Sequence, residues 1–283
     1  MDAHAMFDTA GPRAQRWIRI ITVLSVLGIL GLFALAYYRF YASGALAPST
    51  WLTFTEPGTI RYLGTALKNT MLAAAAAGAM ALPLGLLLAL GRLSRKILPL
   101  RWLCTGIIEL FRAIPVLLVI YVFMFALPAY GIETGTFTKL VVPITLCAAA
   151  TLAEVFRAGV LALPRGQTEA GLSIGLTDGQ TFRTIVLPQA LRIVIPALVA
   201  QAVIVVKDTA FGYVVSYAEL LQSGRVLIAN TGDLVQTYLV VTIIYILVNV
   251  LISWAARALD RRMGRTGARR MSLAAPNRMG GIA

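Results

Sequence analysis

Two acid–arginine pairs with the same spacing lie inside apolar runs of the chain. Glu109 precedes Arg112, and Glu154 precedes Arg157, each by three residues, so the members of a pair face the same side of a helix. Charges within long apolar runs are costly unless they are paired or hydrated, and they mark candidate functional sites. We predict that Glu109, Arg112 and Arg157 form structural ion pairs, and that Glu154 also borders an aqueous path.

A third polar group, Lys207-Asp208-Thr209, interrupts a later apolar run. Neighbouring Lys and Asp side chains point in different directions on a helix, so neither simply neutralises the other. We expect one of them to pair with a charge on another helix and the other to line a path where a cation can attract a carboxylate. Together with Thr151 and Glu154, these residues are the candidates for a substrate path. The alternative is that they form ion pairs between helices.

The most patterned polar segment begins at Glu169 and lies between two long apolar runs. Leu172, Gly175 and Leu176 are three and four residues apart, so we expect them on one face of a short helix. That helix is expected to begin near Glu169, whose charge complements the positive end of the helix dipole. The pattern favours a docking surface for a partner. The alternative is an amphipathic loop that rests on lipid headgroups.

The same segment continues into a second predicted helix. Gly175 permits a turn, and Thr177-Asp178 can cap a helix that runs from about Gly179 towards Leu187. The candidate docking residues are Glu169, Ala170, Gly171, Leu172, Gly175, Leu176, Leu187 and Pro188.

The elements that must position these residues are membrane helices. The chain is 59% hydrophobic and 13% charged, with a mean hydropathy of +0.80, which is far from the balance of a soluble domain. A membrane-spanning helix needs about 20 apolar residues. We predict six, near Ile18–Tyr38, Leu63–Leu90, Leu103–Leu127, Leu140–Leu161, Ile193–Ser216 and Tyr238–Ala256. The first run ends in Ala34-Leu35-Ala36, as a cleaved secretory signal does, but it is too long for a signal core, so we expect an uncleaved helix.

The basic residues alternate between the connections and set the orientation. Four segments hold 17 of the 25 Lys and Arg residues. They are the segment before the first span, the connection between the second and third spans, the connection after the fourth span and the segment after the sixth span. Cytoplasmic loops carry an excess of Lys and Arg, so both termini and the Glu169 loop are predicted to face the cytoplasm. The net charge of +13 is explained by this topology, and no nucleic-acid partner is expected.

Several classes of function find no support in the sequence. The chain has no Gly-rich Lys-Ser/Thr phosphate loop, no His/Asp/Glu cluster with metal-ligand spacing and no serine in a nucleophile elbow. No catalytic residue and no metal site are therefore predicted. Cys104 and Cys147 both lie in apolar stretches and are expected to be reduced packing residues.

From about Gly58 to Arg262 the chain resembles permeases of polar amino acid ABC importers of the histidine/glutamine/glutamate type. The resemblance rests on Glu109-Leu110-Phe111-Arg112-Ala113-Ile114-Pro115, Ala153-Glu154-Val155-Phe156-Arg157-Ala158-Gly159, Leu163-Pro164-Arg165-Gly166-Gln167-Thr168-Glu169-Ala170-Gly171, Gln180-Thr181-Phe182-Arg183, Leu187-Pro188-Gln189-Ala190-Leu191-Arg192 and Lys207-Asp208-Thr209-Ala210. The extra N-terminal helix and its external linker look most like the glutamate/aspartate permeases.

The resemblance implies the fold, the partners and the location. It implies an all-α membrane protein with the type I importer fold, made of a five-helix core and an N-terminal helix, in the bacterial plasma membrane. The expected partners are two ABC ATPases, a second permease subunit, an external amino acid-binding protein and membrane lipid. The ATPases are expected to bind ATP and Mg, and a groove on each ATPase is expected to receive the Glu169–Gly175 loop of a permease. No cofactor is expected on this chain itself. The chain is expected to divide into three parts. Residues 1–57 hold the cytoplasmic N-terminus, the first helix and the external linker, residues 58–262 form the permease domain, and residues 263–283 form a basic cytoplasmic tail.

Two departures from the family pattern matter. The family's Glu-Ala-Ala reads Glu169-Ala170-Gly171 here, and glycine costs about 1 kcal/mol of helix propensity. The stretch Cys147–Thr151 holds fewer polar residues than its relatives have, which favours a heterodimer whose partner supplies more of the substrate site.

The predicted function is ATP-driven import of a polar amino acid, with glutamate first, glutamine or aspartate next, and cystine or a basic amino acid as further options. Two alternatives remain open. An ATP-independent secondary transporter or channel accounts for the spans but not for the patterned loop. A membrane-anchored scaffold accounts for the loop but not for charges inside a span.

Overall fold

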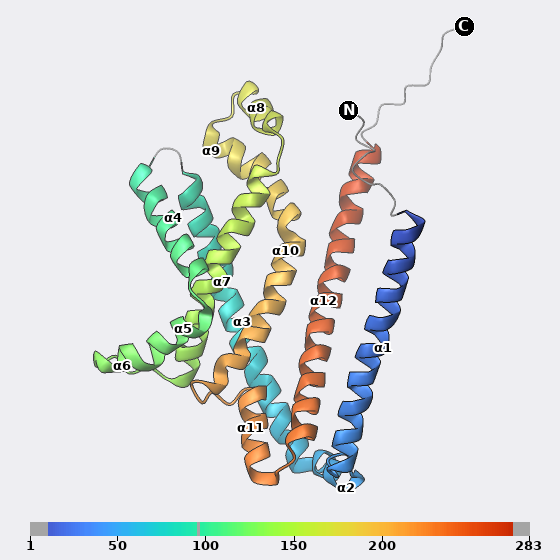
Figure 1. Cartoon of the computed structure of the whole chain (residues 1–283). Coiled ribbons are helices and arrows are strands. Elements are labelled where there is room, and N and C mark those ends of the chain that lie inside the picture. The colour runs from blue at the N-terminus through green and yellow to red at the C-terminus, as the bar shows by residue number, and fades with distance from the viewer. Residues whose placement is uncertain (1–10, 95–96, 274–283) are drawn as a thin grey trace.

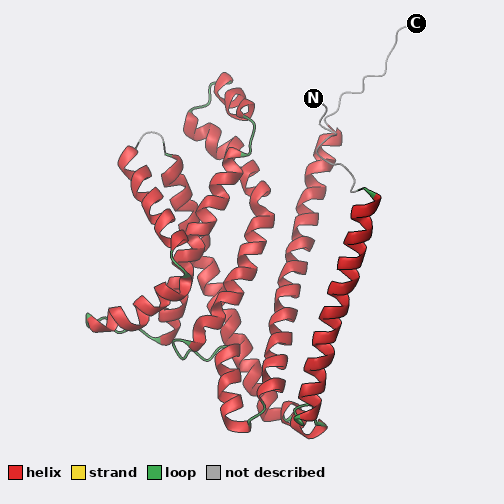
Figure 2. Ribbon diagram, in the orientation of Figure 1, coloured by secondary structure: helices red, strands yellow, loops and turns green. Residues whose placement is uncertain are grey.

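The computed structural model describes residues 11–94 and 97–273, and every regular element within these ranges is helical (Figures 1 and 2). The long helices are α1 (Pro12–Ala42), α3 (Pro57–Leu93), α7 (Thr136–Leu161), α10 (Leu187–Asp208) and α12 (Leu234–Leu273). The shorter ones are α2 (Pro48–Trp51), α4 (Leu98–Ala113), α5 (Val116–Tyr121), α6 (Leu127–Ala129), α8 (Arg165–Ser173), α9 (Asp178–Thr181) and α11 (Leu220–Thr231).

The number of membrane crossings agrees with the prediction. Five helices of the described chain are long and apolar enough to cross a membrane, and a bent pair adds a sixth if it is counted as one span. The start of α1 and the end of α12 lie at the same end of the molecule as α8 and α9 (Figure 1). The basic connections thus share one end, and the cytoplasmic orientation of that end stays a prediction from charge.

The core is built around the contact between α3 and α7. Small residues recur every four positions along α3 and are almost fully buried, namely Ala73, Ala77, Ala81, Gly85 and Ala89. Such a stripe lets two helix backbones approach closely. A Cβ atom added at Gly85 would lie 2.8 Å from both the Ala149 carbonyl oxygen and the Leu152 Cβ of α7. Bulk at this stripe would therefore separate the two helices.

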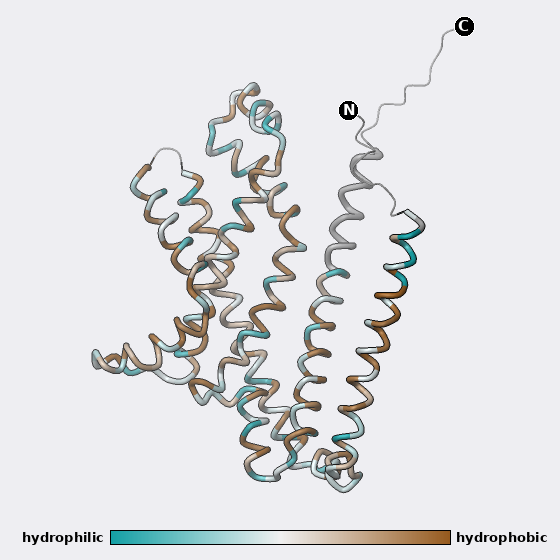
Figure 3. The backbone as a smooth tube through the Cα atoms, viewed as in Figure 1, coloured by the Kyte–Doolittle hydropathy of each residue, from teal (hydrophilic) through white to brown (hydrophobic). Residues whose placement is uncertain are grey.

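The N-terminal helix α1 stands apart from this core. The apolar part of α1 has no buried residue, and Figure 3 shows a continuous apolar middle between more polar ends. The linker after α1 is bound to α12, where Gln236 donates to the Thr50 hydroxyl oxygen at 2.7 Å and to the Ala45 carbonyl oxygen. The extra helix is therefore a peripheral addition, with no side chain of its apolar part buried by the rest of the described chain.

The third predicted span, Leu103–Leu127, is not one straight helix. Helix α4 ends at Ala113, and the segment 116–129 leaves it at an angle of 99°. Pro115 lacks a backbone N–H and disfavours a helical conformation at the residue before it, so Ile114 is extended. The segment continues through a π-helical turn, Val122–Ala126, and projects sideways from the bundle (Figure 1).

The fifth predicted span, Ile193–Ser216, is also corrected. Helix α10 begins earlier, at Leu187, and ends at Asp208 in a 3₁₀ turn, Thr209–Tyr213. Ser216 has a positive φ of 56°, which breaks the chain direction. Helix α11 then follows, where the sequence analysis placed no element, and Gly232 ends it in the left-handed conformation with φ 79°.

The predicted boundary at residue 262 does not coincide with a break in the backbone. Helix α12 continues to Leu273, so the first part of the basic tail extends the last span as a helix. Residues 274–283 of the tail lie outside the described residues.

Candidate coupling and translocation sites

The Glu169 loop forms a helix–turn–helix that projects beyond the bundle (Figure 1). Helix α8 starts at Arg165, and Pro164 is its N-cap residue, with an extended ψ of 137°. Glu169 consequently lies in the middle of α8, and no acidic residue occupies its first turn. The prediction that Glu169 complements the positive end of the helix dipole is wrong.

The end of α8 differs from the predicted shared face. The Gly175 N–H donates to the Leu172 carbonyl oxygen at 3.0 Å, and the Leu176 N–H donates to the Gly171 carbonyl oxygen at 3.2 Å. With Gly175 at φ 85°, these two bonds form a Schellman motif. Gly175 and Leu176 therefore terminate α8, and Leu172 alone of the three lies on the helix.

The outward surface of this loop is partly apolar. Glu169 and Ala170 are exposed, Leu172 is 43% exposed and Ile174 is 75% exposed. Ile174 was missed in the sequence analysis, although it lies between two residues that were selected. An acidic residue beside exposed aliphatic side chains is a surface that a partner protein can cover.

A capping box opens the second helix of the loop. The Thr177 hydroxyl accepts from the Gln180 N–H at 3.3 Å, and the Gln180 side-chain oxygen accepts from the Thr177 N–H at 2.9 Å. The chain then passes from α9 through a π-helical turn, Phe182–Val186, directly into α10. The second helix that was predicted after Thr177-Asp178 is thus present and continuous with a membrane span.

Gly171 holds the two helices of the loop together. A Cβ atom at this position would lie 2.6 Å from Thr181 Cγ2, 2.9 Å from Thr181 Oγ1 and 3.0 Å from Ile185 Cδ1. The sequence analysis selected Gly171 as a docking residue and as a loss of helix propensity, but Gly171 is buried and offers no surface to a partner. Its larger role is the close packing of α8 on the chain that enters α10.

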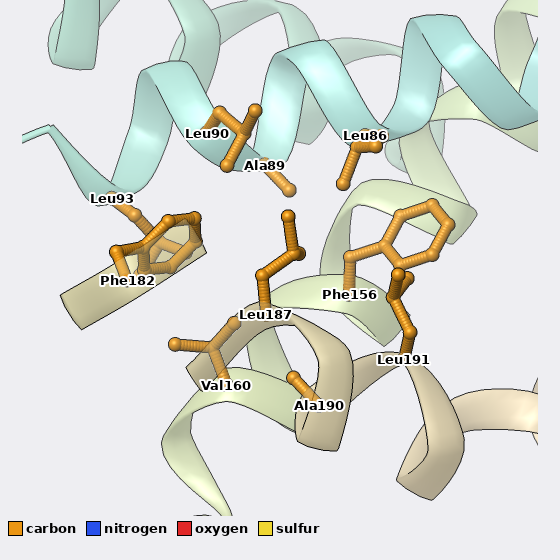
Figure 4. Close-up of a pocket in the computed structure, with 10 residues that line it drawn as sticks. All are labelled: Leu86, Ala89, Leu90, Leu93, Phe156, Val160, Phe182, Leu187, Ala190 and Leu191. Atoms are coloured by element: carbon orange, nitrogen blue, oxygen red, sulfur yellow. The ribbon is translucent and has the colours of Figure 1, made fainter. Parts of the chain in front are cut away.

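Leu187 joins this loop to the bundle. Its side chain points between α3 and α7 towards Ala89 and Leu90, while Phe182 lies against Leu93 (Figure 4). The residual void among these side chains is only about 10 Å³. Pro188 lies in the first turn of α10, directly after the π-helical turn Phe182–Val186. The loop is therefore packed directly against α3 and α7.

Both predicted acid–arginine pairs are present, and a residue missed in the sequence analysis joins them. Glu154 Oε2 lies 2.8 Å from Arg157 Nη2, and Glu109 Oε2 lies 3.7 Å from Arg112 Nη1. Arg92 at the end of α3 contacts Glu109 at 3.0 Å and also forms an ion pair with Glu154. The charges thus form one network across the ends of α3, α4 and α7. The only sequence signal for Arg92 was its membership of a basic connection.

The candidate substrate-path residues do not form a single cluster. Thr209 is fully buried and donates to the Val206 carbonyl oxygen at 2.6 Å, and Thr151 donates to the Cys147 carbonyl oxygen at 3.1 Å. Lys207 is exposed and Asp208 is half-buried at the far end of α10. Glu154 is engaged by arginines near the opposite end of the bundle.

A buried acid, Glu219, supports the turn that follows Asp208, and the sequence analysis did not select it. Its carboxylate accepts from the backbone N–H groups of Leu221 at 2.8 Å and Gln222 at 2.7 Å, and from the Tyr245 hydroxyl at 2.7 Å. Burial raises the pKa of Glu219, and these three hydrogen bonds oppose the rise. Glu219 therefore caps α11 and fixes it to α12.

Metal chemistry has no support in the described part of the chain, where no group of three His, Cys, Asp or Glu residues is placed to hold an ion. Cys104 and Cys147 are free thiols.

Comparison with known proteins decides the family. Residues 81–265 match the model of the family described as binding-protein-dependent transport system inner membrane component. The chain is also 36% identical over 230 residues to the glutamate transport system permease protein of Corynebacterium glutamicum, with 80% of each chain covered. The chain belongs to this family of inner membrane transport components.

Further relatives agree with this membership. The permease is 33% identical over 198 residues to a probable glutamine ABC transporter permease protein of Bacillus subtilis, which covers 70% of this chain and 91% of the relative. It superimposes on a chain of an amino acid ABC transporter crystallised with histidines with a TM-score of 0.71, at 25% identity and with 75% of this chain and 98% of that chain covered. These relatives are transport components of ABC transporters rather than catalytic subunits, in agreement with the family membership.

Proposed function

We propose that this permease forms half of the translocation path of a binding-protein-dependent glutamate importer, and that the α8–α9 loop receives the force of a partner ATPase. The observation that carries the proposal is the mechanical continuity of that loop with the bundle. Gly171 packs α8 on Thr181, and the chain continues from α9 into α10, where Leu187 is held between α3 and α7.

The coupling surface consists of the exposed residues of α8 and its end. Glu169, Leu172 and Ile174 offer one charge and two aliphatic side chains to a groove on the ATPase. Closure of two ATPases around bound ATP would draw two such loops together and turn the attached helices. The pair of loops would then have two arrangements, apart and together, and bound ATP would favour the second. Coupling of ATP hydrolysis to transport requires such a nucleotide-dependent equilibrium between two conformations.

Glutamate as the substrate is supported by the relative in Corynebacterium glutamicum and by the exposed cation Lys207 near the external end of α10. The buried alanines in the middle of α7 support a heterodimer. Ala148, Ala149 and Ala150 are buried, so they pack in the core and offer no polar contact to a solute. A second, different permease would supply the missing polar groups.

The experiment is uptake of radiolabelled amino acids into proteoliposomes that contain this permease, its partner permease, the ATPase and the binding protein. The proposal predicts glutamate uptake that requires ATP and the binding protein, with excess unlabelled glutamine or arginine competing weakly. Equal uptake without ATP would contradict it and would indicate a secondary carrier. ATP-dependent uptake of a different amino acid would keep the importer and reject glutamate.

A further inference from the structure

A cationic groove opens beside the charge network, and the proposed function does not use it. The groove has a volume of about 270 Å³ and is lined by Arg92, Leu93, Arg101, Arg157 and Leu161. These residues come from the last turns of α3 and α7 and the first turn of α4. Three guanidinium groups thus converge where three helices end.

The arginines around the groove exceed the acids that neutralise them. Arg92 and Arg157 share Glu154, and Arg92 also shares Glu109 with Arg112. Arg101 forms no ion pair with any residue of the described chain, so four guanidinium groups meet two carboxylates. An excess of two positive charges at a partly desolvated site is stabilised by an external anion.

Hydrogen-bond donors remain free to bind that anion. Arg92 uses Nη1 for both of its carboxylates, and Arg157 uses Nε and Nη2 for Glu154. A guanidinium carries five N–H donors in a planar fork, which matches the oxygens of a phosphate group. Nη2 of Arg92, Nη1 of Arg157 and the whole Arg101 guanidinium are therefore available.

The border of the groove distinguishes a lipid from a free anion. Leu161 in its lining is 61% exposed, and the neighbouring surface of α4 exposes Leu98, Trp102 and Leu103 by 57%, 69% and 62%. An exposed tryptophan among aliphatic side chains beside arginines is the composition of a membrane interface at headgroup depth. Acyl chains can cover these apolar side chains while the phosphate reaches the arginines.

We propose that the Arg92–Arg101–Arg157 groove binds the phosphate group of an anionic phospholipid from the leaflet on the side of α8. A basic pocket between membrane helices is suited to such a headgroup, and the excess of two charges favours a lipid with two phosphates. A lipid held here would bridge α3, α4 and α7 and screen the arginines from one another. The site lies outside the α8–α9 loop and does not depend on which amino acid is transported.

The test is native mass spectrometry of the full-length permease released from detergent micelles that contain phosphatidylcholine, phosphatidylglycerol or cardiolipin. Bound lipid is counted for the native chain, Arg101→Gln, Arg101→Lys and the control Arg192→Gln. Arg101 is chosen because it is exposed and forms no ion pair in the described chain, so its loss leaves the charge network intact. Arg192 is an exposed arginine at the same end of the bundle, on α10 and outside the groove.

We expect cardiolipin to be retained more than phosphatidylglycerol, and both more than phosphatidylcholine. Arg101→Gln should lower the preference for the anionic lipids about fivefold, from about 1 kcal/mol per arginine at the surface, while Arg101→Lys and Arg192→Gln retain it. Equal losses in Arg101→Gln and Arg192→Gln would overturn the proposal. Displacement of the lipid by inorganic phosphate or by glutamate at similar concentration would also overturn it and assign the groove to a soluble anion.

Discussion

Arg92 of α3 forms an ion pair with Glu154 of α7, and the same guanidinium lies 3.0 Å from Glu109 of α4. One side chain therefore joins the ends of the consecutive helices α3 and α4 to the end of α7, which lies 62 residues further along the chain. Because the Arg92 and Glu154 side chains are only 21% and 18% exposed, the pair is shielded from much of the screening that weakens surface ion pairs.

Arg92→Gln should therefore destabilise the permease by about 2 kcal/mol, since two acids lose a charged partner at a half-buried site. Thermal unfolding of the purified chain in detergent measures the change. Arg112→Gln is the matched control, because Arg112 is 42% exposed and lies 3.7 Å from Glu109. The control should lose no more than about 1 kcal/mol. Equal losses in both variants would mean that Arg92 does not join the three helices.

Gly171→Ala should impair coupling although alanine favours a helix. The added methyl group would lie 2.6 Å from Thr181 Cγ2, and overpacking of this kind costs about 1–3 kcal/mol against a gain of about 1 kcal/mol in propensity. We expect lower transport-coupled ATPase activity in the reconstituted transporter. Thr181→Ala removes the two nearest colliding atoms and leaves Ile185 Cδ1 at 3.0 Å, so the double variant should recover most of the activity. A single Gly171→Ala variant with native activity would show that the two helices can separate without consequence.

Leu187→Ala should loosen the attachment of the loop to the bundle. Removing a side chain held among residues of α3 and α7 leaves a cavity and costs about 2 kcal/mol. We expect ATP hydrolysis to persist while uptake per ATP falls, which simultaneous measurement of both rates detects. Ile193→Ala, at a side chain that is 47% exposed, is the control for loss of an aliphatic group from α10. A parallel fall of uptake per ATP in both variants would argue against a specific role for Leu187.

The raised pKa of Glu219 predicts the direction of one pH effect. When burial raises the pKa of an acid in the folded state, the folded protein binds the proton more tightly than the unfolded chain. Stability is then lost as the pH rises from the ordinary value of 4.5 through the raised pKa. Thermal unfolding in detergent across this window should show the loss in the native chain and a flatter profile in Glu219→Gln. Equal slopes in the two proteins would assign the pH dependence to other groups.

The sequence predicted the general architecture because its strongest signals are local. Long apolar runs predict the spans, and basic connections predict which ends lie together. The sharp break of the predicted span Leu103–Leu127 at Pro115 was not predicted, because proline is also common inside continuous membrane helices, as Pro83 is here in α3. Only the packing around the helix end decides between a continuous helix and a 99° break.

For the site residues too, the sequence predicted the contacts between near neighbours but not those between distant segments. Local spacing predicted the pairs of Glu109 with Arg112 and of Glu154 with Arg157, which the structure contains. It did not predict Arg92 or Glu219, because their partners lie on other helices or depend on a turn. Gly171 is a similar case, since its close contact with Thr181 arises only after α8 folds back on α9.

The central claim, that the α8–α9 loop couples this permease to an ATPase, is tested most directly by Glu169→Lys. The variant and the control Glu133→Lys, an exposed acid before α7, would be compared in proteoliposomes with the partner subunits and binding protein. We predict that Glu169→Lys lowers uptake and substrate-stimulated ATP hydrolysis about tenfold or more, because the reversed charge meets a surface complementary to an acid. Glu133→Lys should behave as the native chain. Native rates of uptake and hydrolysis in Glu169→Lys would contradict the account.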